Sequence, residues 1–413
     1  MVKKDIYILV LTIITLAILV ACSQPSQPQK PAEVKTVKYG VVCVQSGPIA
    51  FMGLGILRAV QLATSNINKN GTTGLGPGLK VGDQAYKIEV VSYDDGFDPA
   101  KSVAGYRQLV EMHGVKVIQG PMGCPCALAA MKINEELGVI IAPFCASDNT
   151  RKMGDKLYIQ ERMPVQHYAL PLAKAAWDRG YRTVCIVSDL ADSWSGMSKE
   201  FKNQFEKLGG QVPALEIVDM SKTTDYHSIM TNFKSKNPDI IFVVMYDEPI
   251  ALAVSHAFEV GYNGKFMFPS EMGPKTEQKI GLDKLDGSLV QSHEWTLYRK
   301  YPDMDKKGAV TNVLRQWKEA YNETPAQTAV PAWDTCYMLA RAMEIAGTVT
   351  DPYAIRAACP KALQEGKLPQ LIPATDMLDN GLPYGAFENL CVIKDGKYNV
   401  IVDKLIVPRS VLE

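Results

Sequence analysis

The chain has 413 residues, of which 47% are hydrophobic and 21% are charged. The 44 basic and 44 acidic side chains give a formal net charge of zero, so electrostatics give no reason to expect a nucleic-acid partner. This length supports two domains, each large enough to bury a core of its own.

The N-terminal residues 1–21 have the pattern of a secretory signal peptide. Two lysines precede an apolar run over 6–20, which is shorter than the ~20 residues of a membrane-spanning helix. Ala21 directly before Cys22 resembles a bacterial lipobox, which would make Cys22 the lipidated N-terminus. Residues 22–35 are rich in Ser, Gln and Pro and are typical of a solvated tether. We therefore expect an extracytoplasmic protein held at the membrane by lipid alone, the alternative being an uncleaved signal anchor.

Short apolar runs then alternate with segments of helical periodicity, the pattern of a parallel α/β sheet. In the first series we expect strands at 39–44, 87–92, 115–119 and 139–142. The helices expected between them lie at 53–68, 102–112 and 127–137. A polar, glycine-containing loop follows most of these strands.

A second series repeats the same order after residue 168. Its expected strands lie at 183–188, 213–217, 240–244 and 265–269. Its expected helices lie at 170–179, 195–208, 226–235 and 249–260. Further along the chain we expect a strand at 288–292, helices at 306–321 and 332–346, and paired strands at 386–394 and 397–408. The repeated order predicts two similar lobes.

Several segments carry a resemblance to a known family. Residues 45–53 (QSGPIAFMG) resemble the first binding loop of type I periplasmic binding proteins, which include the leucine/isoleucine/valine-binding proteins of ABC transporters. Residues 93–100 (YDDGFDPA) look like the DD-x-x-DP-x-x-A segment of that family. Residues 180–184 open the second lobe as in the family, and 225–245 resemble its following helix and strand. Together these segments extend the resemblance over nearly all of the mature chain.

The resemblance implies an α/β fold of two doubly wound parallel-sheet lobes joined by three hinge crossovers. Lobe 1 is expected over 36–162 and 290–372, and lobe 2 over 163–289 and 373–413. Ligands of open α/β sheets bind beyond the carboxyl ends of the strands, and hinge closure buries them. A small molecule is therefore expected between the lobes.

Three loops of the first lobe are expected to face the ligand. Their candidate residues are Ser46, Phe51, Met52, Cys124, Ala146 and Ser147. Phe51 and Met52 equally suit packing beneath their loop. The resemblance implies that the ligand carboxylate is received by Ala146 N–H, by Ser147 and at Cys124, where relatives have a serine. A thiol is a weaker donor than a hydroxyl.

In the second lobe the candidate residues are Ser193, Trp194, Tyr246, Ser270 and Glu271. The resemblance implies that Trp194 and Tyr246 line the pocket and that Glu271 or Ser270 pairs with a ligand ammonium. A solvated loop carboxylate is the alternative for Glu271. The many aromatic and apolar candidates predict a pocket for an aromatic or larger hydrophobic acid.

Besides Cys22 the chain has eight cysteines, an even number that permits disulfides in an exported protein. Cys124, Cys126 and Cys145 fall on adjacent predicted loops. The alternatives for them are a disulfide, buried thiols or a soft-metal site, and the one-residue spacing of Cys-Pro-Cys argues against the metal.

The sequence contains no G-x-S-x-G, H-E-x-x-H or Walker motif, so we expect neither enzymatic activity nor a cofactor. The leading hypothesis is a monomeric, lipid-anchored solute-binding protein that delivers a small amino acid-like or carboxylate ligand to an ABC permease. The alternatives are a ligand-sensing receptor module without transport and a cysteine-based metal-binding protein.

Overall fold

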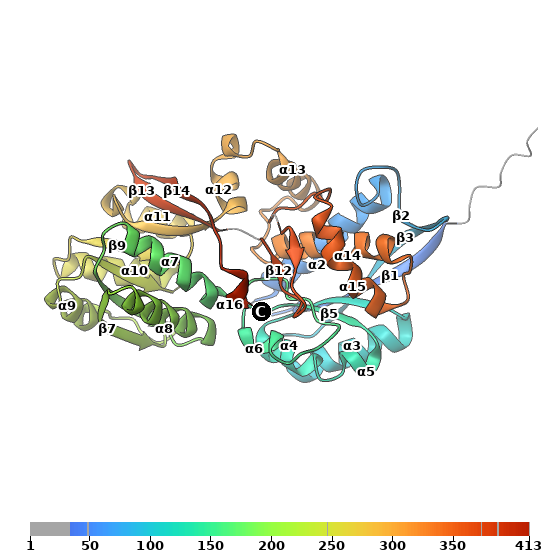
Figure 1. Cartoon of the computed structure of the whole chain (residues 1–413), viewed down its shortest axis with the longest axis horizontal. Helices are drawn as coiled ribbons and strands as arrows, with labels where there is room; N and C mark the ends of the chain where they lie inside the picture. The colour runs from blue at the N-terminus through green and yellow to red at the C-terminus, as the bar shows by residue number, and fades with distance from the viewer. Residues whose placement is uncertain (1–33, 48, 246, 373, 386–387, 413) are drawn as a thin grey trace, which may run out of the picture.

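The computed structural model describes residues 34–412 except 48, 246, 373 and 386–387, and it forms two lobes (Figure 1). The described strands make a five-stranded sheet, a seven-stranded sheet and a two-stranded ribbon. The predicted α/β architecture with two sheet-centred lobes is thereby confirmed. The predicted signal peptide and the lipidation residue Cys22 lie outside the described residues. Within the described part of the chain, no helix has the length and apolarity needed to cross a bilayer.

The first sheet has the strand order β2–β3–β1–β4–β5. β1 (Lys35–Cys43) runs parallel to β3 (Gln84–Asp94) and β4 (Val117–Met122), and β4 runs parallel to β5 (Ile140–Phe144). β2 (Leu79–Val81) adds an antiparallel edge that the sequence pattern did not predict. Because the order reverses at β1, its carboxyl end is the switch point where such sheets bind ligands.

Helices cover both faces of this sheet. One face carries α2 (Ala50–Asn70), α14 (Ala329–Ala346) and α15 (Pro352–Gln364). The other face carries α3 (Pro99–His113), α4 (Cys124–Ala130) and α5 (Asn134–Leu137). Two C-terminal helices therefore complete the core of the first lobe.

The second sheet has the order β14–β13–β10–β9–β8–β6–β7. Its parallel strands are β6 (Thr183–Asp189), β7 (Gln211–Val218), β8 (Ile240–Val244), β9 (Lys265–Phe268) and β10 (Leu289–His293). β13 (Glu388–Lys394) and β14 (Lys397–Leu405) extend it as an antiparallel hairpin. The sheet is thus mixed, with its parallel switch point at β6.

The second lobe is also covered on both faces. α7 (Ala169–Asp178) and α8 (Asp192–Lys207) pack on one face. α9 (His227–Ser235), α10 (Asp247–Glu259) and α11 (Pro274–Ile280) pack on the other. The remaining α-helices and strands are α6 (Asp148–Arg151), α12 (Glu294–Lys300), α13 (Ala309–Tyr321), α16 (Arg409–Leu412), and the ribbon strands β11 (Asp376–Met377) and β12 (Pro383–Tyr384).

Three segments cross between the lobes: the first between β5 and β6, the second after β10, and the third between α15 and β13. The expected lobe boundary at 289/290 would cut through β10. In the structure Leu289 pairs with Met267 of β9 and with Val392 of β13, so the whole strand belongs to the second sheet. We therefore correct this boundary and place the second crossover after His293.

Candidate functional site

A cavity of about 280 Å³ lies where the two lobes meet. All three crossovers line it, with Glu161 on the first, Trp295 on the second and Ile372 on the third. His293 at the end of β10 and Glu388 at the start of β13 line it where the second crossover begins and the third ends. Asp334 fixes the start of the third crossover, because its carboxylate accepts Leu371 N–H and Ile372 N–H, both at 2.7 Å. A cavity bounded by hinge segments changes shape whenever the lobes rotate.

Aromatic side chains form much of the cavity wall. They are Phe144, Tyr168, Trp194 and Trp295. Phe144 ends β5 of the first lobe and Trp194 stands in the first turn of α8 of the second, so the two sheets contribute opposite walls. Apolar walls with a few polar groups are typical of small-molecule sites.

A polar cluster closes the cavity on the side of the second sheet. His293 Nδ1 lies 2.5 Å from Glu388 Oε1, and Ser292 donates a hydrogen bond to Glu271. Burial raises the pKa of Glu271 to about 7, against the opposing charge of His293. Burial lowers the pKa of His293, but the charges of Glu388 and Glu271 outweigh it and raise the pKa overall. The charges of these two carboxyl groups therefore favour the protonated form of His293.

Glu161 forms a second polar group on the side of the first lobe. Its side chain is only 7% exposed, and burial raises its pKa to about 8. Gln119 Nε2 donates to Glu161 Oε1 at 2.5 Å, and Gln119 Oε1 accepts from Tyr39 at 2.6 Å. Among the described residues, Glu161 Oε2 and Glu388 Oε2 are buried without a hydrogen-bond partner. Such atoms in a cavity wall are suited to a polar group of a ligand.

The structure brings three sequence-predicted residues to this cavity: Trp194, Ser270 and Glu271. Tyr246 lies outside the described residues. Ser193 is half-buried beside Trp194 and does not line the cavity.

The predicted residues of the first lobe do not line this cavity. Phe51 is 63% exposed, while Met52 packs partly buried against the core of its own lobe. The hydroxyl of the exposed Ser46 bonds to Asp94. For Met52, packing beneath the loop is the arrangement observed.

The loop after β5 makes a contact between the lobes. Ser147 caps α6 by accepting Asn149 N–H at 3.2 Å, and its hydroxyl donates to Asp192 of α8 at 3.3 Å. Ala146 packs against the core of the second lobe. These residues therefore join the lobes in this structure, with the Ser147 hydroxyl already engaged.

The acidic motif at 93–100 shapes the first loop. Asp94 Oδ1 accepts Gln45 N–H at 2.8 Å, which fixes the start of the loop after β1. Asp95 accepts the Ser102 hydroxyl, and Asp98 caps α3 by accepting from Ala100 N–H. The motif thus positions a loop at the switch point by structural hydrogen bonds.

The sequence is similar to a family of known proteins over most of its length. The family model described as "Periplasmic binding protein" matches residues 36–380. The chain is a type I periplasmic binding protein of the Leu/Ile/Val-binding protein family. The "leucine-, isoleucine-, valine-, threonine-, and alanine-binding protein" of Pseudomonas aeruginosa is 25% identical over 327 residues, covering 78% of this chain and 82% of that protein.

Solved structures share the fold of this periplasmic binding protein. A branched-chain amino acid transporter substrate-binding protein from Streptococcus pneumoniae, in complex with isoleucine, has a TM-score of 0.69 at 20% identity and covers 90% of this chain and 100% of its own. A solute-binding protein of an ABC transporter from R. palustris, in complex with benzoate, has a TM-score of 0.65 at 18% identity, with coverage of 91% and 99%.

The sequence hypothesis for Cys124 in this periplasmic binding protein needs correction. Cys124 and Cys145 form a disulfide with their Cα atoms 5.0 Å apart, so Cys124 has no thiol hydrogen for a ligand. The same bond leaves Cys126 as the free thiol of the three, so the soft-metal alternative, which needs three thiolates, does not hold in this structure. The disulfide alternative is the one observed.

We expect the double variant Cys124→Ala/Cys145→Ala to lose about 3 kcal/mol of unfolding free energy, because the bond closes residues 124–145 into a loop in the unfolded chain. Urea unfolding with and without a thiol reductant checks this. Reduction should weaken the parent protein and leave the double variant unchanged; equal curves for parent and variant without reductant would contradict it.

Sequence reasoning missed the residues on the crossovers and at their junctions with the second sheet, chiefly Glu161, Arg162, His293 and Glu388. These positions lie up to 227 residues apart, and only the assembled hinge brings them together. One signal was present, since the charged pair Glu161–Arg162 follows the apolar run 157–159 after a single residue, at the predicted lobe boundary.

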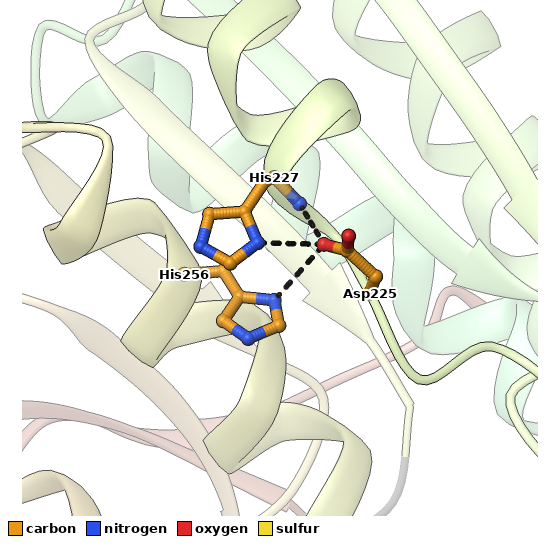
Figure 2. Close-up of side chains that lie close together, drawn as sticks. All are labelled: Asp225, His227 and His256. Carbon is orange, nitrogen blue, oxygen red and sulfur yellow. Dashed lines mark hydrogen bonds and ion pairs between the residues drawn. The ribbon is translucent and has the colours of Figure 1, made fainter.

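A separate cluster of potential metal ligands lies on the second lobe, away from the cavity (Figure 2). His227 Nδ1 is 2.6 Å from Asp225 Oδ1, and His227 Nε2 is 2.7 Å from Glu259 Oε2. His256 Nδ1 accepts Tyr226 N–H at 3.0 Å, and the two imidazole rings stack with centroids 3.9 Å apart. Hydrogen bonds within the protein thus use the nitrogen atoms that face Asp225, and the cluster ties α9 to α10.

We expect this tie to weaken as the solution becomes alkaline. Hydrogen bonds to Asp225 and Glu259 raise the pKa of His227, so its stabilisation is complete below the ordinary histidine pKa and is lost as the pH rises through the raised value. His227→Gln should therefore lower the melting temperature at pH 6 and much less at pH 9, by a difference on the order of 1 °C for an exposed site. His113→Gln is the matched control; the same loss for His227→Gln at both pH values would contradict the expectation.

Proposed function

We propose that this protein is the solute receptor of an ABC importer and that it encloses a small amino acid or carboxylate between its lobes. The observation that carries the proposal is the cavity bounded by all three crossovers. Hinge closure around such a space would enclose a ligand and, in the same motion, change the outer shape of the protein. Relatives and structural neighbours named for amino acids and for benzoate support this ligand class.

We further propose an aromatic or bulky apolar ligand. Two tryptophans, Trp194 and Trp295, stand in the wall with Tyr168 and Phe144, and their large flat surfaces favour a planar or bulky partner. The volume of about 280 Å³ is at the small end of the range for ligand sites and suits a single-ring acid or an amino acid.

We also propose a lipid anchor and a permease as the contacts of this protein at the membrane. A lipid chain on Cys22 would hold the mature monomer outside the cytoplasmic membrane, and the lobe surfaces around the closed cleft would dock the permease. Mass spectrometry of the mature N-terminal peptide tests the lipid directly.

The ligand is tested by denaturing the purified protein and identifying small molecules that are released. We expect one amino acid or carboxylate in stoichiometric amount, and readdition of that compound should reduce the radius of gyration in X-ray scattering. An unchanged scattering profile and melting temperature across a panel of amino acids and aromatic acids would overturn the proposed function.

A further inference from the structure

Arg162 on the first crossover presents an unneutralised cation to the cavity. It is half-buried, lines the cavity, and its guanidinium carbon lies 5.8 Å from the centroid of the Phe144 ring. No hydrogen bond or ion pair joins this guanidinium to another residue in the described part of the chain. The five N–H donors of this guanidinium at the cavity wall therefore have no protein acceptor among the described residues.

Each nearby carboxyl group already contacts another residue of the protein. Glu388 lies against His293 at 2.5 Å, Glu271 accepts from Ser292, and Glu161 accepts from Gln119. Arg162 is nevertheless close enough to His293 that its charge opposes the protonation of the imidazole. The cation therefore belongs to the polar end of the cavity without being neutralised there.

We propose that Arg162 binds the carboxylate of the ligand, an inference that rests on the proposed function. A guanidinium donates two parallel N–H bonds to a carboxylate, a geometry that a lysine cannot reproduce. The Phe144 ring beneath it limits the orientation of the guanidinium plane.

This assignment moves the anion site from the first-lobe loops to the hinge. Ser147, which the family resemblance assigns to the carboxylate, already donates to Asp192 and accepts from Asn149. Cys124 is closed in a disulfide. A carboxylate at Arg162 would also leave Glu161 Oε2 and Glu388 Oε2 facing the rest of the ligand, where a hydroxyl or ammonium donor could reach an unpartnered oxygen.

The test compares acids with their amides. Benzoate and benzamide, and L-leucine and L-leucinamide, are titrated by calorimetry into the full-length protein and into Arg162→Gln, Arg162→Lys and Arg299→Gln. Arg299 is the competing cation, exposed and stacked 5.0 Å from the Trp295 centroid. Arg107→Gln, outside the cavity, is the control for lost surface charge.

We expect the preferred acid to bind the parent protein far more tightly than its amide. Arg162→Gln should weaken the binding of the acid by ~100-fold and change the binding of the amide by no more than a few-fold, because a charged hydrogen-bond pair is lost. The acid affinity of Arg162→Lys should lie between those of Arg162→Gln and the parent protein. Equal melting temperatures of variant and parent would show that folding is intact. The inference is overturned if Arg162→Gln binds the acid as tightly as the parent protein does. It is also overturned if Arg299→Gln loses the acid affinity and Arg162→Gln does not. Either result leaves the proposed function standing. If the parent binds none of these probes or the wider panel, the proposed function itself is overturned, and this inference with it.

Discussion

Glu161→Gln should make the protein more stable at pH 8 and leave its stability almost unchanged at pH 4.5. In the unfolded chain this carboxyl loses its proton near its ordinary pKa, whereas burial in the cavity wall raises the pKa of the folded group to about 8. Between these values the folded state binds one more proton than the unfolded state, so the free energy of unfolding falls as the pH rises. Across this pH window the parent protein loses unfolding free energy on the order of 4 kcal/mol, and the variant does not, because glutamine has no proton to lose.

The substitution preserves the local hydrogen bonds. The introduced glutamine would still offer a carbonyl oxygen to Gln119 Nε2, and its amide would replace the protonated Oε2 of Glu161 in the cavity. The Tyr39–Gln119 bond at 2.6 Å is untouched. The stability gained by the variant at pH 8 therefore measures the cost of burying the Glu161 charge.

Guanidinium unfolding of parent and variant at pH 4.5 and pH 8 measures the effect. Glu136→Gln is the matched control, because that side chain is 67% exposed. Asp334, another buried acid whose pKa burial raises to about 8, contributes equally to both proteins and cancels in the difference. A stability difference between parent and Glu161→Gln that is the same at both pH values would show that Glu161 does not titrate in this window.

The repeating strands and helices were predictable because their pattern is local. β8 occupies 240–244 as predicted, since five consecutive apolar residues are all buried in a parallel sheet. α15 (Pro352–Gln364) was missed, although Asp351 caps it by accepting Tyr353 N–H, because Pro360 inside it interrupts the helical pattern. The helix predicted at 127–137 is divided into α4 and α5.

The candidate site was predictable only in part, for a geometric reason. Trp194 and Glu271 follow strands of one sheet, so the carboxyl-end rule places them at the cleft. Glu161 lies on the first crossover, whereas His293 ends β10 and Glu388 begins β13 where the other two crossovers join the second sheet, so their meeting depends on how the lobes are joined. Neither periodicity nor motif spacing contains that information.

Arg356→Met should destabilise the protein by about 3–5 kcal/mol, because Arg356 links α15 to two crossovers. Its side chain is 8% exposed; Nε donates to Tyr158 O at 2.9 Å, and a terminal nitrogen donates to Asp379 O at 3.1 Å and Leu378 O at 3.4 Å. Tyr158 lies in the first crossover, between β5 and β6, and 378–379 lie within the third. Methionine would fill the space but leave the buried Tyr158 carbonyl and the Asp379 carbonyl without the guanidinium donor, while Leu378 O would keep its bond from Gly381 N–H.

Denaturant unfolding monitored by tryptophan fluorescence measures this loss. Arg315→Met provides the surface control, since Arg315 is 59% exposed and pairs with Glu319 one helical turn away, where we expect a change below about 0.5 kcal/mol. Arg356→Lys should recover part of the loss, because an ammonium can still reach one carbonyl. If Arg356→Met unfolds at the denaturant concentration of the parent, the crossovers are held by apolar packing alone. A hinge fixed in that way would leave lobe rotation independent of α15.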